Sequence, residues 1–180
     1  MTTIRLAEAA DLDALIALRI ESETWLHAAG IQQWVDRERG IRNLREGVAA
    51  GVTYVVDDGG TVAATLTLNG PDRDFWTDED DPENALYLYK FIIGPAHRGT
   101  GLGDALLDWA CAEAEGRGKA LLRLDCWREN KSLQRYYLDR GFHHVRTVQV
   151  AGRGSGALFE RPADLRTTTR SLTSAVTDEC

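Results

Sequence analysis

The sequence predicts a mixed α/β protein in which helices flank a central sheet. Short runs rich in β-branched and aromatic residues alternate with stretches whose apolar residues recur every three or four positions. The predicted order is strand, helix, helix, three strands, helix, strand, helix and two strands, without an internal repeat. Such an order is typical of a single sheet with helices packed on it.

The first half of the chain predicts a strand, two helices and a hairpin. Residues 3–8 are the strand, and Asp11 caps a helix that Gly30 ends. The apolar face of this helix consists of Leu12, Leu15, Ile16, Leu18 and Ile20. A second helix is predicted over residues 42–51. Residues 52–68 form a hairpin, because two β-branched runs flank an Asp-Asp-Gly-Gly turn.

The second half begins with a long polar loop over residues 69–84. Residues 85–93 are a strand too apolar for a solvent-exposed edge, and a glycine-rich stretch with its helix follows. The remaining predicted elements are a strand at 120–127, a helix at 130–140 and a hairpin within 142–160.

Composition indicates one soluble domain over residues 1–165 and an aperiodic Ser/Thr-rich tail over 166–180, which we expect to lack structure. The hydrophobic content is 43% and the charged content 27%. No apolar run is long enough for a membrane span, and three scattered cysteines suit a reducing compartment, so we expect a cytoplasmic protein. A net charge of −7 argues against nucleic acid and favours a cationic partner.

The stretch HRGTGLG, residues 97–103, places three glycines at alternate positions where a helix begins. A strand that leads into such a turn directs several backbone N–H groups at one point, and the helix dipole adds to their attraction for an anion. These residues therefore predict a phosphate site. The competing interpretation is a tight turn, which needs fewer glycines.

Two nucleotide motifs compete for this loop. A P-loop requires Lys followed by Ser or Thr after its last glycine, but Asp104 and Ala105 stand there. A dinucleotide fingerprint is favoured by Asp125, which ends the next strand about 20 residues on. Its third glycine, however, would fall on Asp104 or Leu106. A dinucleotide-binding oxidoreductase stays as a minor alternative.

The pattern Arg98-x-x-Gly101-x-Gly103 resembles the pyrophosphate loop of the GCN5-related N-acetyltransferase (GNAT) family, which holds acetyl-coenzyme A. The second half of the family pattern follows as Asn130, Tyr136-Tyr137 and Gly141-Phe142, with Leu133 where alanine is usual. The resemblance is clear over residues 86–142. It implies a GNAT-type fold, a mixed central sheet whose middle strands splay apart.

The resemblance also implies how acetyl-CoA binds. Backbone groups of one strand would pair with pantetheine, and the amides of the glycine loop would take the pyrophosphate. The strand residues are Phe91, Ile92 and Ile93, and the loop residues are Arg98, Gly99, Thr100, Gly101, Leu102 and Gly103. Asn130 would contact the pantetheine arm, and asparagine just before a helix is also a good N-cap. No metal is implied.

Tyr137 is the candidate general acid by this resemblance. It lies seven residues after Asn130, two helical turns along the same face. A phenol with a pKa of about 10 can protonate a thiolate whose thiol has a pKa of about 8.5. A core aromatic is the competing interpretation, and Tyr136 is the other candidate for the acid.

The segment around Asp125 also resembles the alanine N-acetyltransferases that modify ribosomal proteins, which have a glutamate at that place. This resemblance makes Asp125 the candidate base, directly or through a bridging water. An ordinary strand-end acid paired with Arg123 or Lys90 is the alternative. Histone-type relatives place their glutamate on the preceding strand, where this chain has Tyr87.

Three further features have mainly structural interpretations. Cys126 is interpreted as a small buried residue and not as the nucleophile of an acyl-enzyme, since the neighbouring Asp125 would raise the pKa of its thiol. The acidic run Asp78–Asp81 is a solvated loop or helps to attract an amine. The aromatics at one end of the sheet are core residues or walls of an acceptor pocket: Trp25, Trp34, Trp76, Trp127, Tyr87 and Tyr89.

We therefore expect an acetyl-CoA-dependent N-acetyltransferase that acts by direct attack of an amine on the thioester, with a backbone N–H near Ile92 or Ile93 steadying the oxyanion. A binding module that holds an acyl-CoA without turnover is the second hypothesis. The acceptor is expected to be an amine, and a small molecule is the favoured class. The sequence does not decide between an antibiotic, a polyamine, an amino acid and a protein N-terminus. A homodimer is also compatible with the sequence.

Overall fold

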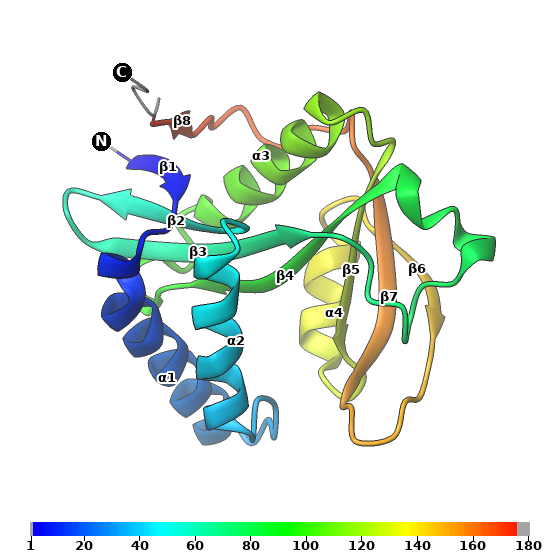
Figure 1. The fold of residues 1–180 in the computed structure, drawn as a ribbon, viewed down its shortest axis with the longest axis horizontal. Coiled ribbons are helices and arrows are strands. Elements are labelled where there is room, and N and C mark those ends of the chain that lie inside the picture. Colours follow the sequence, from blue (N-terminus) through cyan, green and yellow to red (C-terminus); the bar gives the residue numbers. More distant parts are fainter. Residues whose placement is uncertain (1, 176–180) are drawn as a thin grey trace. The chain divides into compact units, whose positions relative to one another are not determined.

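Within residues 2–175, the part that the computed structural model describes, eight strands form one mixed sheet in the order β6-β7-β5-β4-β3-β2-β1-β8, with helices beside it (Figure 1). The strands are β1 (Thr2–Leu6), β2 (Thr53–Asp58), β3 (Val62–Asn69), β4 (Ala85–Ile93), β5 (Leu121–Trp127), β6 (His143–Thr147), β7 (Ser155–Pro162) and β8 (Thr173–Ser174). The α-helices are α1 (Leu12–Ala28), α2 (Arg37–Ala49), α3 (Leu102–Gly116) and α4 (Lys131–Leu138). The predicted mixed α/β class is confirmed.

The chain divides into two compact units. Unit 1 consists of Met1–Thr67, Lys90–Gly103 and Arg170–Cys180, and unit 2 consists of Leu68–Tyr89 and Asp104–Thr169. Strands β3 and β4 contribute residues to both units.

Unit 1 is an antiparallel hairpin extended by β1 and packed with α1 and α2. Strand β1 pairs antiparallel with β2, from Thr2 opposite Asp58 to Leu6 opposite Tyr54. The helices α1 and α2 lie side by side (Figure 1). Ala7, Leu15 and Val55 form a buried cluster in this unit, so the alternating apolar residues of the strands face the helices.

Unit 2 is built on β5, which has a parallel and an antiparallel neighbour. The parallel ladder joins Ala85–Leu88 of β4 to Leu121–Leu124 of β5, and β7 runs antiparallel along the whole of β5. The next pair of residues, Tyr89 and Asp125, is not part of the parallel ladder. Pairing between the middle strands is therefore short, as the expected splay requires.

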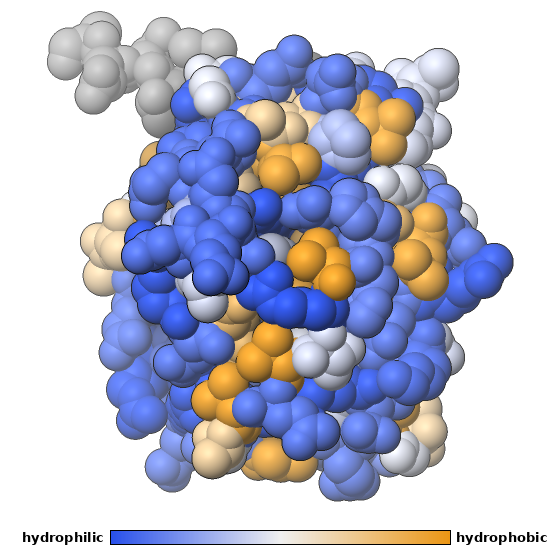
Figure 2. Space-filling model, turned by 90° about the vertical axis from the view of Figure 1, so that its right-hand side faces the viewer, coloured by the Kyte–Doolittle hydropathy of each residue, from blue (hydrophilic) through white to orange (hydrophobic). Residues whose placement is uncertain are grey.

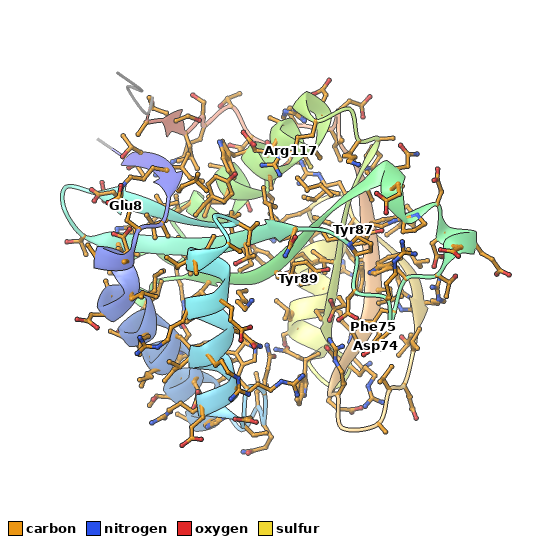
Figure 3. All side chains as sticks on the ribbon, viewed as in Figure 1. Glu8, Asp74, Phe75, Tyr87, Tyr89 and Arg117 are labelled. Carbon is orange, nitrogen blue, oxygen red and sulfur yellow. The ribbon has the colours of Figure 1, made fainter. Side chains whose placement is uncertain are left out.

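The long loop over residues 69–84 is better packed than its polar sequence predicts. Phe75 and Trp76 are 1% exposed and form a core cluster with residues of β4 and β7; Phe75 and Tyr87 are labelled in Figure 3. Arg146 of β6 forms two hydrogen bonds of 2.7 Å with Asp80, and its guanidinium lowers the pKa of Asp80 to about 2. The acidic run is therefore partly paired, not simply solvated.

Two helix starts differ from the sequence-based expectation. Asp11 makes no side-chain cap on α1; its carboxylate accepts the Glu8 N–H at 2.8 Å and pairs with Arg5 at 2.7 Å, closing a short 3-10 turn instead. Helix α2 begins at Arg37, five residues before the predicted start, because the Asp36 side chain accepts the Arg39 N–H at 2.9 Å.

The first part of the tail is structured, contrary to expectation. Thr167 and Thr168 donate backbone N–H groups to Asp108 at 2.7 and 2.9 Å. Thr173 and Ser174 pair in parallel with β1 as β8. The expectation for residues 176–180 lies outside the described residues.

The described residues contain no helix with the length and apolar character that a membrane crossing requires. The face drawn in Figure 2 is mainly hydrophilic, with separate small hydrophobic patches.

Candidate functional site

The glycine loop lies between the end of β4 and the start of α3. A short 3-10 turn, Pro95–His97, follows β4, and α3 begins at Leu102. Gly99 and Gly101 have φ angles of 73° and 80°, in the left-handed region that glycine adopts without a steric penalty. Two of the three predicted glycines are thus required by the backbone itself.

The same two glycines leave one side of the loop uncovered. A Cβ atom added to Gly99 or Gly101 would meet nothing within 4 Å, and Thr100 between them is exposed. The first backbone N–H groups of a helix have no intrahelical partner, and they carry the positive end of its dipole. A phosphate group can therefore approach this backbone closely, which fits the predicted pyrophosphate loop.

Arg98 is held in place by residues of unit 1. Its Nε donates to the Ile93 carbonyl at 3.3 Å, and its guanidinium lies 4.2 Å from the ring centroid of Trp25. Burial lowers the pKa of Arg98, against the opposing charge of Glu21. A cation fixed in this way beside the loop adds to its attraction for an anion.

Sequence reasoning missed Arg170, which supports the loop from the tail. Its Nη1 donates to the Thr100 carbonyl at 2.7 Å, while the Thr100 hydroxyl donates to the His97 carbonyl at 2.7 Å. His97 in turn lies 3.2 Å from Asp58 of the β2–β3 hairpin. No periodicity or motif in the tail could have indicated this contact.

The strand segment expected to pair with pantetheine is the end of β4. Ile92 is buried, whereas Phe91 and Ile93 are half-buried. The preceding residue, Lys90, has a φ of 50°, an uncommon conformation for a residue with a Cβ atom. Strain of this kind concentrates at functional sites, and here it directly precedes the predicted cofactor segment.

Asn130 caps helix α4. Its side chain accepts the Leu133 N–H at 3.0 Å, and the residue is 7% exposed. The capping role that the sequence suggested is confirmed.

Tyr137 is enclosed in the core of unit 2. It is 5% exposed, and its ring contacts those of Phe142 and Phe159 at centroid distances of 5.4 and 6.2 Å. Burial raises the pKa of Tyr137 well above its usual value, and Cys126, Tyr136 and Asp125 act in the same direction. The hydroxyl therefore stays protonated at neutral pH, as a general acid must.

Tyr136, the other candidate, is engaged elsewhere. The guanidinium of Arg140 lies 3.6 Å from the centroid of its ring, and Arg140 also pairs with Asp104. Tyr136 is thus part of a half-buried cluster with Arg140 and Asp104.

Asp125 lies half-buried on β5. Burial raises its pKa, and this effect is opposed by a hydrogen bond with Ser155 and by the charge of Arg153. Arg123 pairs with Glu160 at 2.9 Å, so the expected alternative, an Asp125–Arg123 pair, is not the arrangement found. A carboxylate with a raised pKa is a stronger base, which suits the predicted role.

The neighbouring groups offer no competing chemistry. Burial raises the pKa of the Cys126 thiol to about 12, and Asp125 adds to the shift, so its thiolate is unavailable as a nucleophile. Tyr87 donates to the Pro82 carbonyl at 3.0 Å and accepts from Arg123, a structural role. The part of the chain that the structure describes holds no cluster of His, Cys, Asp and Glu suited to a metal ion.

The model of the acetyltransferase (GNAT) family matches residues 14–142. The chain belongs to the GNAT family. This membership makes it an acyltransferase and confirms the resemblance that the loop and the α4 segment carried.

Similar proteins agree with this assignment. The uncharacterized N-acetyltransferase YesJ of Bacillus subtilis is 28% identical over 141 residues, covering 75% of this chain and 78% of its own length. S-(2-succino)cysteine N-acetyltransferase of Bacillus subtilis is 27% identical over 108 residues, covering 58% and 61%. PaiA N-acetyltransferase from Thermoplasma acidophilum, solved in complex with coenzyme A, has a TM-score of 0.64 at 18% identity, covering 90% of this chain and 99% of that one.

Proposed function

We propose that this GNAT protein transfers an acetyl group from acetyl-CoA to a primary amine by direct attack. The amine nitrogen attacks the thioester carbonyl, the C–S bond breaks, and CoA leaves as a thiolate. The observation that carries the proposal is the uncovered glycine backbone before α3, where a Cβ atom added to Gly99 or Gly101 would meet nothing within 4 Å.

Each predicted residue has a defined part in this reaction. The loop from Arg98 to Gly103 binds the pyrophosphate, and Phe91, Ile92 and Ile93 pair with the pantetheine amides. Asn130, which caps α4, contacts the pantetheine arm. The backbone near Ile92 and Ile93 donates to the oxyanion that forms during attack.

Proton transfer is assigned to two side chains of unit 2. Asp125, directly or through a water, accepts the proton that the ammonium must lose before it can attack. Tyr137 returns a proton to the thiolate of CoA, and its raised pKa keeps that proton available. A raised pKa at Asp125 supports its role as the base.

The acceptor is a small molecule in this proposal, and a protein N-terminus is the second acceptor class. The name of the relative S-(2-succino)cysteine N-acetyltransferase supports a small amine acceptor. A cytoplasmic location is also part of the proposal, supported by the buried free thiols of Cys111 and Cys126.

Ligand-dependent melting tests the cofactor assignment. Because a ligand that binds the native state stabilises it in proportion to ln(1 + [L]/Kd), acetyl-CoA and CoA should raise Tm at sub-millimolar concentration, and NAD and NADH should not. Release of free thiol from acetyl-CoA in the presence of an amine then tests turnover. A shift with NADH alone would overturn the proposal, and a shift with CoA without thiol release for any amine would favour the binding module.

A further inference from the structure

Arg19 of α1 is a buried cation whose guanidinium has no hydrogen-bond acceptor among the described residues. The residue is 6% exposed, and its side chain makes no hydrogen bond or ion pair with any residue that the structure describes. Its Nε is fully enclosed. An unpaired guanidinium is costly to bury, and a fold keeps such a group only where something else repays the cost. A ligand that supplies the missing acceptors is the direct explanation.

The guanidinium is held rigidly between two residues of unit 1. It lies 4.4 Å from the ring centroid of Trp34, whose backbone has a strained φ of 61°. On α2, a Cβ added to Gly40 would come within 2.5 Å of its Cζ, Nη1 and Nη2 atoms. Glycine is a poor helix former, so its use here leaves room for the guanidinium. A guanidinium whose position is already fixed loses little conformational entropy when it binds a ligand.

The charge of Glu23 acts on Arg19, but the two side chains make no hydrogen bond with each other. Glu23 lies one turn along α1, but its Oε1 accepts two hydrogen bonds from Arg37, at 3.1 and 3.0 Å. Its Oε2 is enclosed without a partner, as is the Ser22 hydroxyl oxygen. The guanidinium of Arg19 therefore keeps N–H donors that no described residue accepts, the complement of a molecule that carries an anion.

A second cation acts on the same region. Burial lowers the pKa of Lys90, and the charge of Arg19 lowers it further, so the two cations lie near each other. The opposing carboxylates Asp36 and Glu46 are exposed, where water screens them. Lys90 directly precedes Phe91, so this positive region is continuous with the strand segment assigned to pantetheine.

We propose, resting on the function proposed above, that Arg19 binds a carboxylate of the acceptor and that the acceptor class is therefore amino carboxylates, such as free amino acids. The planar fork of arginine matches a carboxylate through two parallel hydrogen bonds. A dianionic phosphate fits less well, because the negative charge of Glu23 acts on the same region.

Paired substrates test this specificity. The standard L-amino acids, their α-carboxamides and neutral amines would each be offered with acetyl-CoA, and free thiol would be measured. For the amino acid that the parent protein acetylates fastest, we expect kcat/KM to be at least tenfold higher for the free acid than for its α-carboxamide. In Arg19→Met the ratio should fall to near one through a higher KM, while calorimetry shows unchanged affinity for CoA. Arg19→Lys, which keeps the charge without the fork, should fall between them.

Two further variants make the test specific. Arg39→Met removes an exposed arginine of α2 and should leave the ratio unchanged. Gly40→Ala keeps the charge but displaces the guanidinium, so it should lower the ratio even if Arg19→Met fails to fold. Circular dichroism checks the fold of each variant.

The outcomes separate the two proposals. A parent protein that acetylates carboxamides or neutral amines as well as the free acids, or an Arg19→Met variant that keeps the ratio, overturns the role of Arg19 and leaves acetyl transfer intact. A protein that binds no CoA and releases no thiol with any amine overturns the proposed function, and this inference with it.

Discussion

Tyr137 combines a ring that belongs to the core with a hydroxyl available for chemistry. Its ring packs on Phe142 and Phe159, and burial raises the pKa of its hydroxyl well above the usual value. The sequence could place this tyrosine only by the family pattern, because a core role and a catalytic role give the same residue at the same helical position.

Tyr137→Phe should therefore keep packing and CoA affinity while turnover falls. A positioned acid is worth about 10²–10⁴ in rate, so kcat should drop by that factor. Steady-state kinetics with saturating acetyl-CoA and calorimetry with CoA measure the two quantities. Tyr136→Phe is the matched control and should keep most of the activity, because Tyr136 is engaged with Arg140. The opposite pattern would show that the acid is Tyr136.

Asp125→Asn should change the pH profile as well as the rate. Burial raises the pKa of Asp125 in the folded protein, so the parent rate should fall as pH drops through that raised pKa and the base becomes protonated. The asparagine variant should lose about 10²–10⁴ in kcat at neutral pH and recover partly at high pH, where more of the amine is already neutral. Equal rates for parent and variant across the whole pH range would place the base elsewhere.

At the scale of elements, the glycine loop shows how backbone conformation and ligand access coincide. Gly99 and Gly101 take left-handed φ angles, and the space where their side chains would lie is empty. The sequence predicted this loop well because its requirements are local. The start of α2 and the strand β8 were missed, since a cap at Asp36 and a pairing with β1 leave no periodic signal.

Gly101→Val should weaken CoA binding without unfolding the protein. Valine tolerates a positive φ badly, and its branched side chain would occupy the space that the pyrophosphate needs. Affinity measured by calorimetry should fall tenfold or more, about 1.4 kcal/mol. Gly51→Val is the matched control, because Gly51 has a φ of 66° and the same empty surroundings but follows α2. If Gly101→Val binds CoA as tightly as the parent protein and Gly51→Val do, the loop does not hold the pyrophosphate.

At the scale of the whole molecule, the contacts that sequence reasoning could not reach join distant residues. Asp80 and Arg146 are 66 positions apart, and their ion pair turned an acidic loop from a solvated segment into a packed one. Arg19, Trp34 and Gly40 come together only once α1 and α2 pack. Element order and the site motifs were predictable because they follow from neighbouring residues, whereas burial of a charge depends on the fold.

The parallel pairing of β8 with β1 has a consequence for synthesis on the ribosome. Strand β1 is made long before one of its two neighbours, which is carried by residues 173–174. Until those residues leave the ribosome, one edge of β1 keeps its backbone N–H and C=O groups unpaired, and a strand edge of this kind can pair with other chains. The nascent protein thus passes through a period in which this edge is open to association with other chains.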